Sequence, residues 1–250
     1  MEWVAGFSGI RNDCKHFIAK FVSSTDVYPV VKAEYIAMRL AALAGLNVAP
    51  VSLVSSLGKD VLMIERFDRV DTATGKTRRL MLSGLSLLDL NEMEARYASY
   101  SDLADRIRQR FTEPQATLME LFKRLVFNVL VGNTDDHARN HSAFWDGHQL
   151  SLTPAYDICP QLRTGQEATQ AMDIGGVACK AATLVNVLSV CGKFQLRESD
   201  ARTMIEQLIT VVEDNWVAVC EEAGLAAVER ERLWGRALLN PYCLQDWKPA

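Results

Sequence analysis

The chain has 250 residues, of which 49% are hydrophobic and 23% are charged, and its formal net charge is −4. These values are typical of a globular protein with one large domain or two lobes, and they exclude a disordered chain. They also exclude an overall positive field that would attract nucleic acid or an anionic membrane.

The N-terminal residues MEWVAGFSGIRND lack the pattern of a signal peptide, and no apolar run approaches the ~20 residues that span a bilayer, so we expect a cytoplasmic protein. The six cysteines are widely spaced and include no CxxC pair. This spacing argues against a zinc ribbon or a disulfide framework, and we expect reduced cysteines that fill the core.

Residues 1–70 are predicted to form a small, β-rich lobe. The segment His16–Val22 (HFIAKFV) has the composition of a short strand. A helix is predicted next, in VVKAEYIAMRLAALAGL, where apolar residues recur at helical spacing and Gly45 provides a stop. Two more strands, Pro50–Ser55 and Asp60–Phe67, flank the turn Leu57–Lys59.

The polar stretch Asp71–Arg79 (DTATGKTRR) is predicted to be the boundary with a second lobe, residues 71–250. There, Pro114 begins a broadly apolar helix, PQATLMELFKRLVFNVLVGN, that we expect to be deeply buried. Further amphipathic helices are predicted at Ser199–Glu222 and Ala226–Leu239. The fold class is therefore α+β, with a small β-rich N-terminal lobe and a larger, mostly α-helical C-terminal lobe.

Polar residues crowd into GNTDDHARNHSAFWDGHQLSLTPAYD, directly after the long apolar helix. Within it, HSAFW and QLSLT flank the turn Asp146–Gly147 and predict a β-hairpin. Asn140 precedes the first strand and Asp157 follows the second, so the hairpin brings an amide and a carboxylate to the same end. Because Mg²⁺ prefers hard oxygen ligands, with only one or two from the protein when phosphates are bound, this pattern predicts a magnesium-phosphate site.

The spacing Asp135-x4-Asn140, followed later by Asp157, has the order of a protein-kinase catalytic loop and its second magnesium ligand. A kinase also needs a strand lysine for the nucleotide phosphates and a helix glutamate that holds this lysine. Lys20 in HFIAKF and Glu34 at the start of the next predicted helix fit these two positions. Each feature is weak alone, but their order and spacing together indicate a kinase.

At these residues the sequence resembles the HipA-like serine/threonine kinases, which are toxins of bacterial toxin–antitoxin pairs. The matching segments are IAKF, AEYIAMRLAALAG, IERFDR, NVLVGNTDDHARNHS and LTPAYDICP, and the similarity covers most of residues 16–240. The blocks NTDDHARN and PAYD are the specific part. The resemblance implies a protein-kinase-like two-lobed fold. It also implies an ATP- and Mg²⁺-dependent kinase that phosphorylates a protein hydroxyl, such as that of a translation-related protein, to inhibit growth.

The resemblance gives roles to the residues of the catalytic loop and the hairpin. Asp135 is implied to be the catalytic base that orients and deprotonates the substrate hydroxyl. Asn140 and Asp157 are implied to bind magnesium. His137, in the same loop, is implied to shape the nucleotide-binding site and not to titrate in the reaction.

On the nucleotide side, the resemblance implies that Lys20 contacts the phosphates and that Glu34 holds Lys20. Glu65 and Phe67 are implied to supply backbone hydrogen bonds to adenine. The implied partners are a protein substrate and either a HipB-like antitoxin or a separate small N-subdomain protein.

One departure from the family leaves a second function open. Family members carry a glycine- and serine-containing phosphate loop before the lysine strand, and VAGFSGIRND does not follow that pattern. The alternative to an active kinase is a truncated or non-catalytic kinase-like protein that binds nucleotide or an antitoxin.

The histidines of the polar stretch suggest a different site. His137 and His141 are four residues apart, which suits two zinc ligands on one helix, and His148 follows. Asn140 and the predicted strand after it break such a helix, and the sequence has no HExxH motif. Zinc is therefore the less favoured metal.

Two further interpretations concern the adjacent acids Asp135 and Asp136. A glycosidase-like acid pair must flank one bond, whereas adjacent carboxylates point apart. An ordinary turn, capped by Asn133 and Thr134 and carrying solvated acids, leaves the conjunction with the kinase-like lysine, glutamate and later aspartate unexplained.

Overall fold

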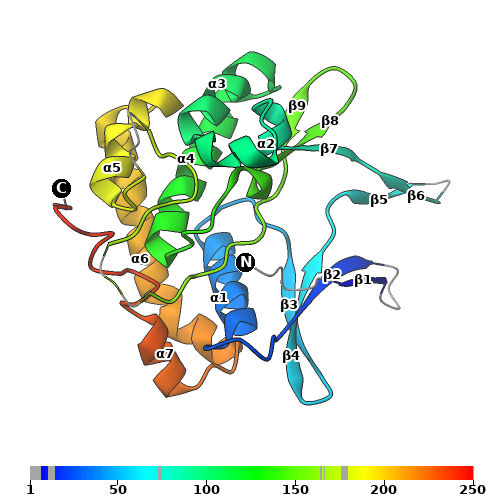
Figure 1. Cartoon of the computed structure of the whole chain (residues 1–250), viewed down its shortest axis with the longest axis vertical. Coiled ribbons are helices and arrows are strands. Elements are labelled where there is room, and N and C mark those ends of the chain that lie inside the picture. The colour runs from blue at the N-terminus through cyan, green and yellow to red at the C-terminus, as the bar shows by residue number, and fades with distance from the viewer. Residues whose placement is uncertain are drawn as a thin grey trace.

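The structure of the protein, a computed structural model, describes residues 7–10, 15–72, 75–163, 165, 167–175 and 180–249. Figure 1 shows strands β1 to β6 on one side of the molecule and most of the helices on the other, with α1 between them. The fold is a mixture of antiparallel sheets and helices, as the α+β prediction requires.

The N-terminal part is built on a four-stranded antiparallel sheet with the strand order β1-β2-β4-β3, and one helix covers it. These elements are β1 Phe7–Ile10, β2 His16–Phe21, α1 Val30–Leu43, β3 Val51–Ser56 and β4 Lys59–Glu65. The strands predicted at 16–22, 50–55 and 60–67 are confirmed with slightly shifted ends. The helix ends at Leu43 because Gly45 adopts φ +74°, where glycine is favoured.

The remaining described chain is mostly helical, with 3₁₀ turns and the three-stranded antiparallel sheet β7-β8-β9. Its elements are β5 Arg69–Thr72, β6 Gly75–Arg78, β7 Leu80–Ser83, α2 Gly84–Leu87, η1 Glu92–Tyr97, α3 Tyr100–Arg110, α4 Pro114–Val131, η2 Ala138–Asn140, β8 Ser142–Trp145, β9 Leu150–Leu152, α5 Leu184–Ser189, η3 Cys191–Phe194, α6 Glu198–Glu222 and α7 Ala227–Leu233. The helix predicted from Pro114 is confirmed, as is the one predicted at 199–222.

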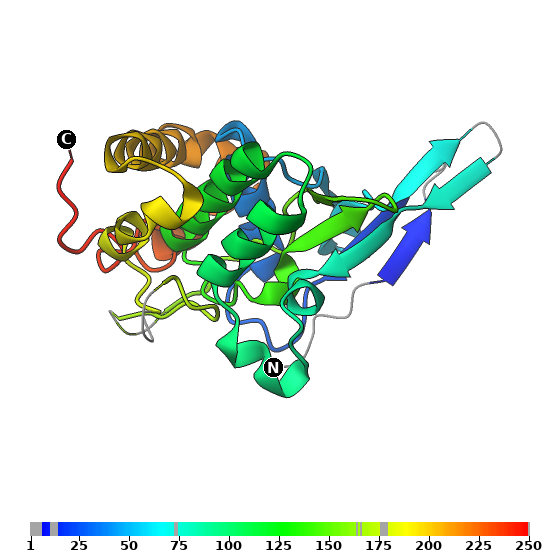
Figure 2. The ribbon, with the colours of Figure 1, turned by 90° about the horizontal axis from the view of Figure 1, so that it is seen from above.

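The stretch Asp71–Arg79, predicted as a polar turn, instead contributes to a second hairpin. Strands β5 and β6 pair antiparallel, with Arg69 opposite Arg78 and Val70 opposite Thr77. Figures 1 and 2 show this hairpin projecting away from the rest of the molecule. The prediction missed it because exposed strands lack an apolar face, and only the β-branched residues signal them.

The helix predicted at Ala226–Leu239 is shorter than expected, because α7 ends at Leu233. Gly235 adopts φ +73°, and its N–H donates to the Leu238 carbonyl 2.8 Å away, which turns the chain out of the helix. An internal glycine in an amphipathic pattern was therefore a stop signal.

Two predictions concern residues that the structure describes only in part. The stretch VAGFSGIRND includes β1, but its other residues lie outside the described ones. Cys14 and Cys179 also lie outside them. The described cysteines are all free thiols, namely Cys159, Cys191, Cys220 and Cys243.

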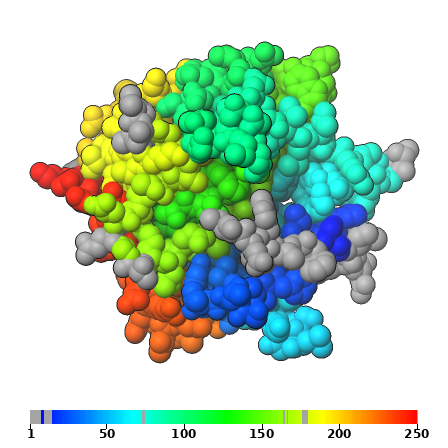
Figure 3. Space-filling view, in the orientation of Figure 1, coloured from blue at the N-terminus to red at the C-terminus, as the bar shows by residue number. Residues whose placement is uncertain are grey.

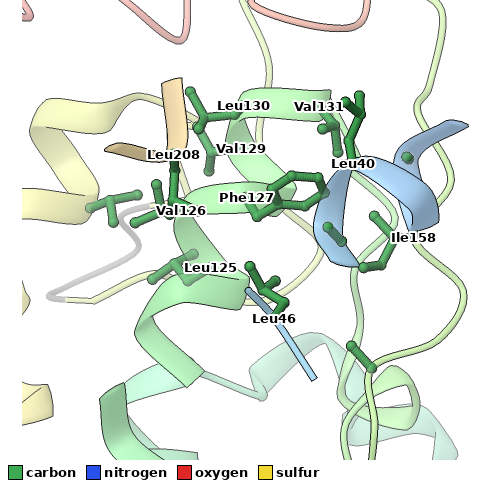
Figure 4. Close-up of a cluster of buried hydrophobic side chains, with 14 of the residues drawn as sticks. Leu40, Leu46, Leu125, Val126, Phe127, Val129, Leu130, Val131, Ile158 and Leu208 are labelled. Carbon is green, nitrogen blue, oxygen red and sulfur yellow. The ribbon is translucent and has the colours of Figure 1, made fainter. Parts of the chain in front are cut away.

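The core is centred on α4, whose C-terminal half is buried on every side from Arg124 to Val131. Figure 4 shows its consecutive residues Leu125, Val126 and Phe127 packed with Leu40 of α1 and Leu208 of α6. Each of these leucines is worth about 1.5–3 kcal/mol when removed from water. A helix packed this way is a rigid support, and its C-terminal end leads directly into the predicted catalytic loop.

The helix α1 joins the two parts of the molecule. It packs on β3 and β4 with one face and on α6 with another. In the space-filling view, the blue and cyan surface of the N-terminal elements borders the green surface of the helical part (Figure 3). Side chains that point from the sheet toward α1 therefore lie close to the loops that follow α4.

Candidate active site

Lys20 of β2 makes two ion pairs, with residues 14 and 137 positions further along the chain. It lies opposite Leu62 of β4 in the sheet, and β4 packs against α1. Its Nζ lies 2.6 Å from Oε1 of Glu34 on α1. The same Nζ contacts Oδ1 of Asp157, which follows the β8–β9 hairpin. The sheet, the helix and the hairpin therefore meet at one ammonium group.

The charges of this cluster differ in their access to water. The exposed fraction of the side chain is 4% for Glu34, 18% for Lys20 and 33% for Asp157. Burial raises the pKa of Glu34. Burial alone would lower the pKa of Lys20, but attraction by Glu34 and Asp157 outweighs it and the pKa is raised. The lysine therefore stays charged, and the accessible charge opposite it is Asp157.

The hairpin before Asp157 forms as the Asp-Gly turn predicts. Strands β8 and β9 pair antiparallel, with Ala143 opposite Leu152. At the open end of the hairpin, the Tyr156 hydroxyl lies 2.6 Å from Oγ of Ser142 and donates to the Arg139 carbonyl at 2.6 Å. These bonds tie the flank that carries Asp157 to the flank that carries Asn140.

Asp157 itself adopts φ +61°, a left-handed conformation that is uncommon for a residue other than glycine. Nδ2 of Asn133 lies 3.5 Å from the Asp157 carbonyl and 3.1 Å from Oδ1 of Asn128 on α4. The support from Asn133 and the bond to Lys20 hold Asp157 in this conformation. Uncommon backbone angles of this kind concentrate at functional sites.

The loop that contains Asp135 begins where α4 ends. Gly132 closes the helix in the left-handed region with φ +70°, and a Cβ there would lie 2.5 Å from the Ala237 carbonyl oxygen. Glycine is therefore required at this turn by both conformation and space. Asp135 follows three residues later, half-buried, and burial raises the pKa of its carboxyl group.

Asp136, the next residue, is almost completely buried, with 2% exposed. Its Oδ2 accepts a hydrogen bond from the Tyr100 hydroxyl of α3 and lies 3.0 Å from Nε2 of His141. The two adjacent acids thus have opposite environments. Asp135 faces the side where solvent has access, whereas Asp136 faces the core.

Asn140 and His137 lie in the same short loop. The backbone N–H of Asn140 donates to the His137 carbonyl at 2.8 Å, within the 3₁₀ turn Ala138–Asn140. This turn is not an α-helix, so His137 and His141 do not occupy stacked positions on one helical face. His141 instead uses Nε2 on Asp136.

Glu65 and Phe67 lie at the end of β4 and beyond it, outside the Lys20 cluster. The Glu65 N–H donates to the Pro50 carbonyl at 2.9 Å, and its carboxylate pairs with Lys15. Proline has no N–H to return, so the Glu65 carbonyl lacks the usual second bond of a paired strand position. The Phe67 ring packs against Tyr156, with centroids 5.6 Å apart, which brings this segment to the hairpin.

The model of the family described as HipA-like C-terminal domain matches residues 4–216, which is most of the chain and contains every residue of the site. The chain belongs to this family. The resemblance read from the motifs is therefore confirmed at the level of the family.

Two curated relatives of this HipA-like chain match it over about half of its length. Protein Y4mE of Sinorhizobium fredii is 32% identical over 146 residues, which are 56% of this chain. The serine/threonine-protein kinase toxin HipA of Shewanella oneidensis is 28% identical over 141 residues, which are 50% of this chain. The matched part covers 33% of the length of each relative.

Solved structures share the fold of this HipA-like chain. HipA in the complex of Shewanella oneidensis HipA, HipB and operator DNA has a TM-score of 0.75 and 21% identity, covering 92% of this chain and 58% of that one. The Helicobacter pylori proinflammatory kinase CtkA has a TM-score of 0.67 and 16% identity, covering 91% and 84%. The kinase-like two-lobed fold class is thereby confirmed.

Sequence reasoning missed the inner face of the catalytic loop in this HipA-like chain. It considered Asp136 only in the less favoured acid-pair and solvated-turn interpretations and His141 only in the less favoured zinc site, and it gave Tyr100 no role. The signal that was present is the adjacency of two acids beside a buried helix.

In the described part of the chain, no helix is both long enough and apolar enough to cross a membrane.

Proposed function

We propose that the protein is an ATP- and Mg²⁺-dependent serine/threonine protein kinase of the HipA-like toxin type. The observation that carries this proposal is the convergence of Glu34 and Asp157 on Nζ of Lys20. A kinase holds its phosphate-binding lysine with a helix glutamate and places a magnesium-binding aspartate beside it. A strand, the helix that follows it and the segment after the β8–β9 hairpin supply these groups in the required order.

Asp135 is proposed as the catalytic base. A general base works best when its pKa lies near the working pH, and burial shifts the pKa of Asp135 in that direction. It lies at the start of the loop whose other end is Asn140. In this position its carboxylate accepts the proton of a serine or threonine hydroxyl as the oxygen attacks the γ-phosphate, and it orients that hydroxyl.

The side chains of Asn140 and Asp157 carry the type of donor atom that a magnesium ion prefers. Both offer hard oxygen atoms, and the two flanks that carry them are bonded together under the hairpin. Asp157 keeps a third of its side chain exposed, so a carboxylate is available for a ligand. When bound, Mg²⁺ neutralises charge on the phosphates, while Lys20 binds the phosphate oxygens directly.

The adenine is proposed to bind the backbone at the end of β4. The Glu65 N–H is used by Pro50, so Glu65 contributes its carbonyl as the acceptor. The complementary donor is proposed to be the Phe67 N–H, two residues further. His137 shapes the loop on the phosphate side and has no part in proton transfer.

The proposed substrate is a hydroxyl group of a protein, such as a translation-related protein, and its phosphorylation is proposed to inhibit growth of the cell. The reaction is proposed to take place in the cytoplasm. A HipB-like antitoxin is the proposed partner, with a separate small N-subdomain protein as the other candidate. The division into residues 1–70 and 71–250 remains our proposed division into lobes.

The test is transfer of labelled γ-phosphate from ATP to proteins of a cell extract by this chain, with Asp135→Asn as the control. Labelled bands that need wild-type protein and Mg²⁺ are expected. Equal labelling by Asp135→Asn would refute the role of Asp135. ATP binding without any transfer would favour the second candidate, a non-catalytic kinase-like protein that binds nucleotide or an antitoxin.

A further inference from the structure

The proposed catalytic loop is held on its core side by the buried carboxylate of Asp136, which the proposed reaction does not use. Asp136 has 2% of its surface exposed, and its partners Tyr100 and His141 have 0% and 4%. A carboxylate at such a depth is strongly destabilising unless hydrogen bonds compensate it. Both bonds converge on one oxygen, Oδ2, one from Tyr100 of α3 and one from His141 at the end of the same loop. The position of Asp136 is therefore fixed in three dimensions.

The contact between Asp136 and His141 closes the loop at both ends. Asp136 directly follows the proposed base Asp135, and His141 directly follows the proposed ligand Asn140. Since Oδ2 and Nε2 lie 3.0 Å apart, the bond pins the neighbours of the two functional residues to each other. Fixing Asp136 on the core side also turns Asp135 to the opposite side. One buried bond thus sets both the separation and the orientation of the reacting groups.

Tyr100 connects this bond to the rest of the fold. Its hydroxyl lies near Asn128 of α4, whose Oδ1 accepts a hydrogen bond from Nδ2 of Asn133 at 3.1 Å. Its backbone N–H donates to the Asp173 carbonyl at 2.9 Å, which fixes the start of α3. Buried polar side chains therefore extend from Asp136 and Tyr100 past Asn128 of the buried helix to Asn133, whose side chain reaches the Asp157 carbonyl.

We infer that Asp136, Tyr100 and His141 form a positioning triad for phosphoryl transfer, a role that rests on the proposed kinase function. The triad touches neither nucleotide nor acceptor. It fixes the distance of Asp135 from Asn140 and Asp157. At this distance Asp135 reaches the acceptor hydroxyl while Asn140 and Asp157 hold the metal ion at the phosphates. Phosphoryl transfer depends chiefly on such positioning, and a displacement of 1 Å lowers a rate by about a hundredfold.

The test compares steady-state kinetics of the full chain for wild type, Tyr100→Phe, His141→Leu and His141→Gln. In Tyr100→Phe the ring stays and the hydroxyl donor is lost. In His141→Leu the Nε2 donor is lost. Glutamine retains an N–H donor at the position of Nε2. We expect kcat to fall about 10- to 100-fold for Tyr100→Phe and His141→Leu, with KM for ATP within about threefold. His141→Gln is expected to recover most of kcat.

Tyr35→Phe is the matched control. Tyr35 is also a buried tyrosine whose hydroxyl donates to a carboxylate, Glu222, but it lies at the α1–α6 contact. It is expected to lower thermal stability with little change in kcat. All rates are measured well below the melting temperature of each variant and are normalised to folded protein.

The outcomes separate this inference from the proposed function. Transfer by wild type with equal kcat in Tyr100→Phe and His141→Leu overturns the positioning role alone. An equal loss in His141→Gln and His141→Leu overturns the role of the donor, and an equal loss in Tyr35→Phe shows a nonspecific effect. Absence of transfer by wild type refutes the kinase proposal and the triad with it.

Discussion

The two faces of the loop at residues 132–141 use the same kinds of side chain for opposite purposes. On the outer face, Asp135 is half-buried and Asp157 keeps a third of its side chain exposed. On the inner face, Asp136 is buried and both of its hydrogen bonds come from the protein. A carboxylate whose bonds are all internal positions the chain, whereas one with accessible oxygen atoms is available to bind or react.

Asp135 and Asp136 are adjacent residues of identical type with different surroundings. Asp135 and Asp136 differ only in which side of the chain they occupy, and the surrounding elements decide that. Substitutions that act on one face and leave the other intact test this division.

Asp135→Asn is expected to abolish transfer, because an amide cannot accept the proton of the acceptor hydroxyl. The loss of rate should reach about 10²–10⁴-fold, the usual contribution of a general base. ATP affinity, measured by calorimetry, should stay within a few-fold, since Asp135 does not hold the nucleotide. In the wild type, the rate should fall as the pH is lowered through the raised pKa of Asp135. A large loss of ATP affinity in the variant would assign Asp135 to binding.

Lys20→Met is expected to destabilise the fold, because Glu34 would be left buried without its cation. Breaking a buried pair on one side costs about 3–5 kcal/mol in the free energy of unfolding, which urea denaturation at neutral pH measures. The double variant Lys20→Met/Glu34→Gln should recover much of this loss. Equal stability of the single variant and the wild type would show that Glu34 does not depend on Lys20.

The Lys20→Met variant should also gain stability as the pH falls. Burial raises the pKa of Glu34 above its ordinary value of 4.5, so the folded state binds this proton more tightly than the unfolded state. The contribution of Glu34 to stability therefore decreases as the pH rises from about 4.5 through the raised pKa. Denaturation curves at acidic and neutral pH check the sign.

Asp157→Ala is expected to weaken ATP binding in the presence of Mg²⁺, because one of the two proposed protein ligands is lost. Calorimetry should show a decrease in affinity of about tenfold, which is 1.4 kcal/mol. Binding without Mg²⁺ should change less, so the ratio of the two affinities is the informative quantity. Identical binding with and without Mg²⁺ in both proteins would contradict the metal role.

Glu92→Gln is expected to have the smallest effect, although it removes a charge that contacts the same loop. Glu92 pairs with Arg139, but 79% of its side chain is exposed, so water screens the interaction. Transfer should stay close to that of the wild type, and stability should change by less than about 1 kcal/mol. A strong loss of kcat here would mean that the loop is held from its outer face, against the inner triad.

Much of the fold was predictable because local rules decide it. Pro114 and Gly132 delimit α4, Gly45 follows the end of α1, and the turn Asp146–Gly147 forms the β8–β9 hairpin. The exposed β5–β6 hairpin and the early end of α7 at Leu233 were not predicted. There, polar strands and a single internal glycine give signals too weak to read from a pattern of apolar residues.

The sequence by itself determined the inventory and order of the candidate site: a strand lysine, a helix glutamate, the loop Asp135-x4-Asn140 and a later aspartate after a hairpin. Spacing along the chain is enough for this, because the hairpin and the helices are local structures. Only the tertiary structure decided that Lys20 contacts both Glu34 and Asp157 and that Asp136 faces Tyr100 of α3. The residues of these three contacts are 14, 137 and 36 positions apart in the sequence, and no local rule sets such contacts. The packing of the whole core decides which side of the loop is excluded from water.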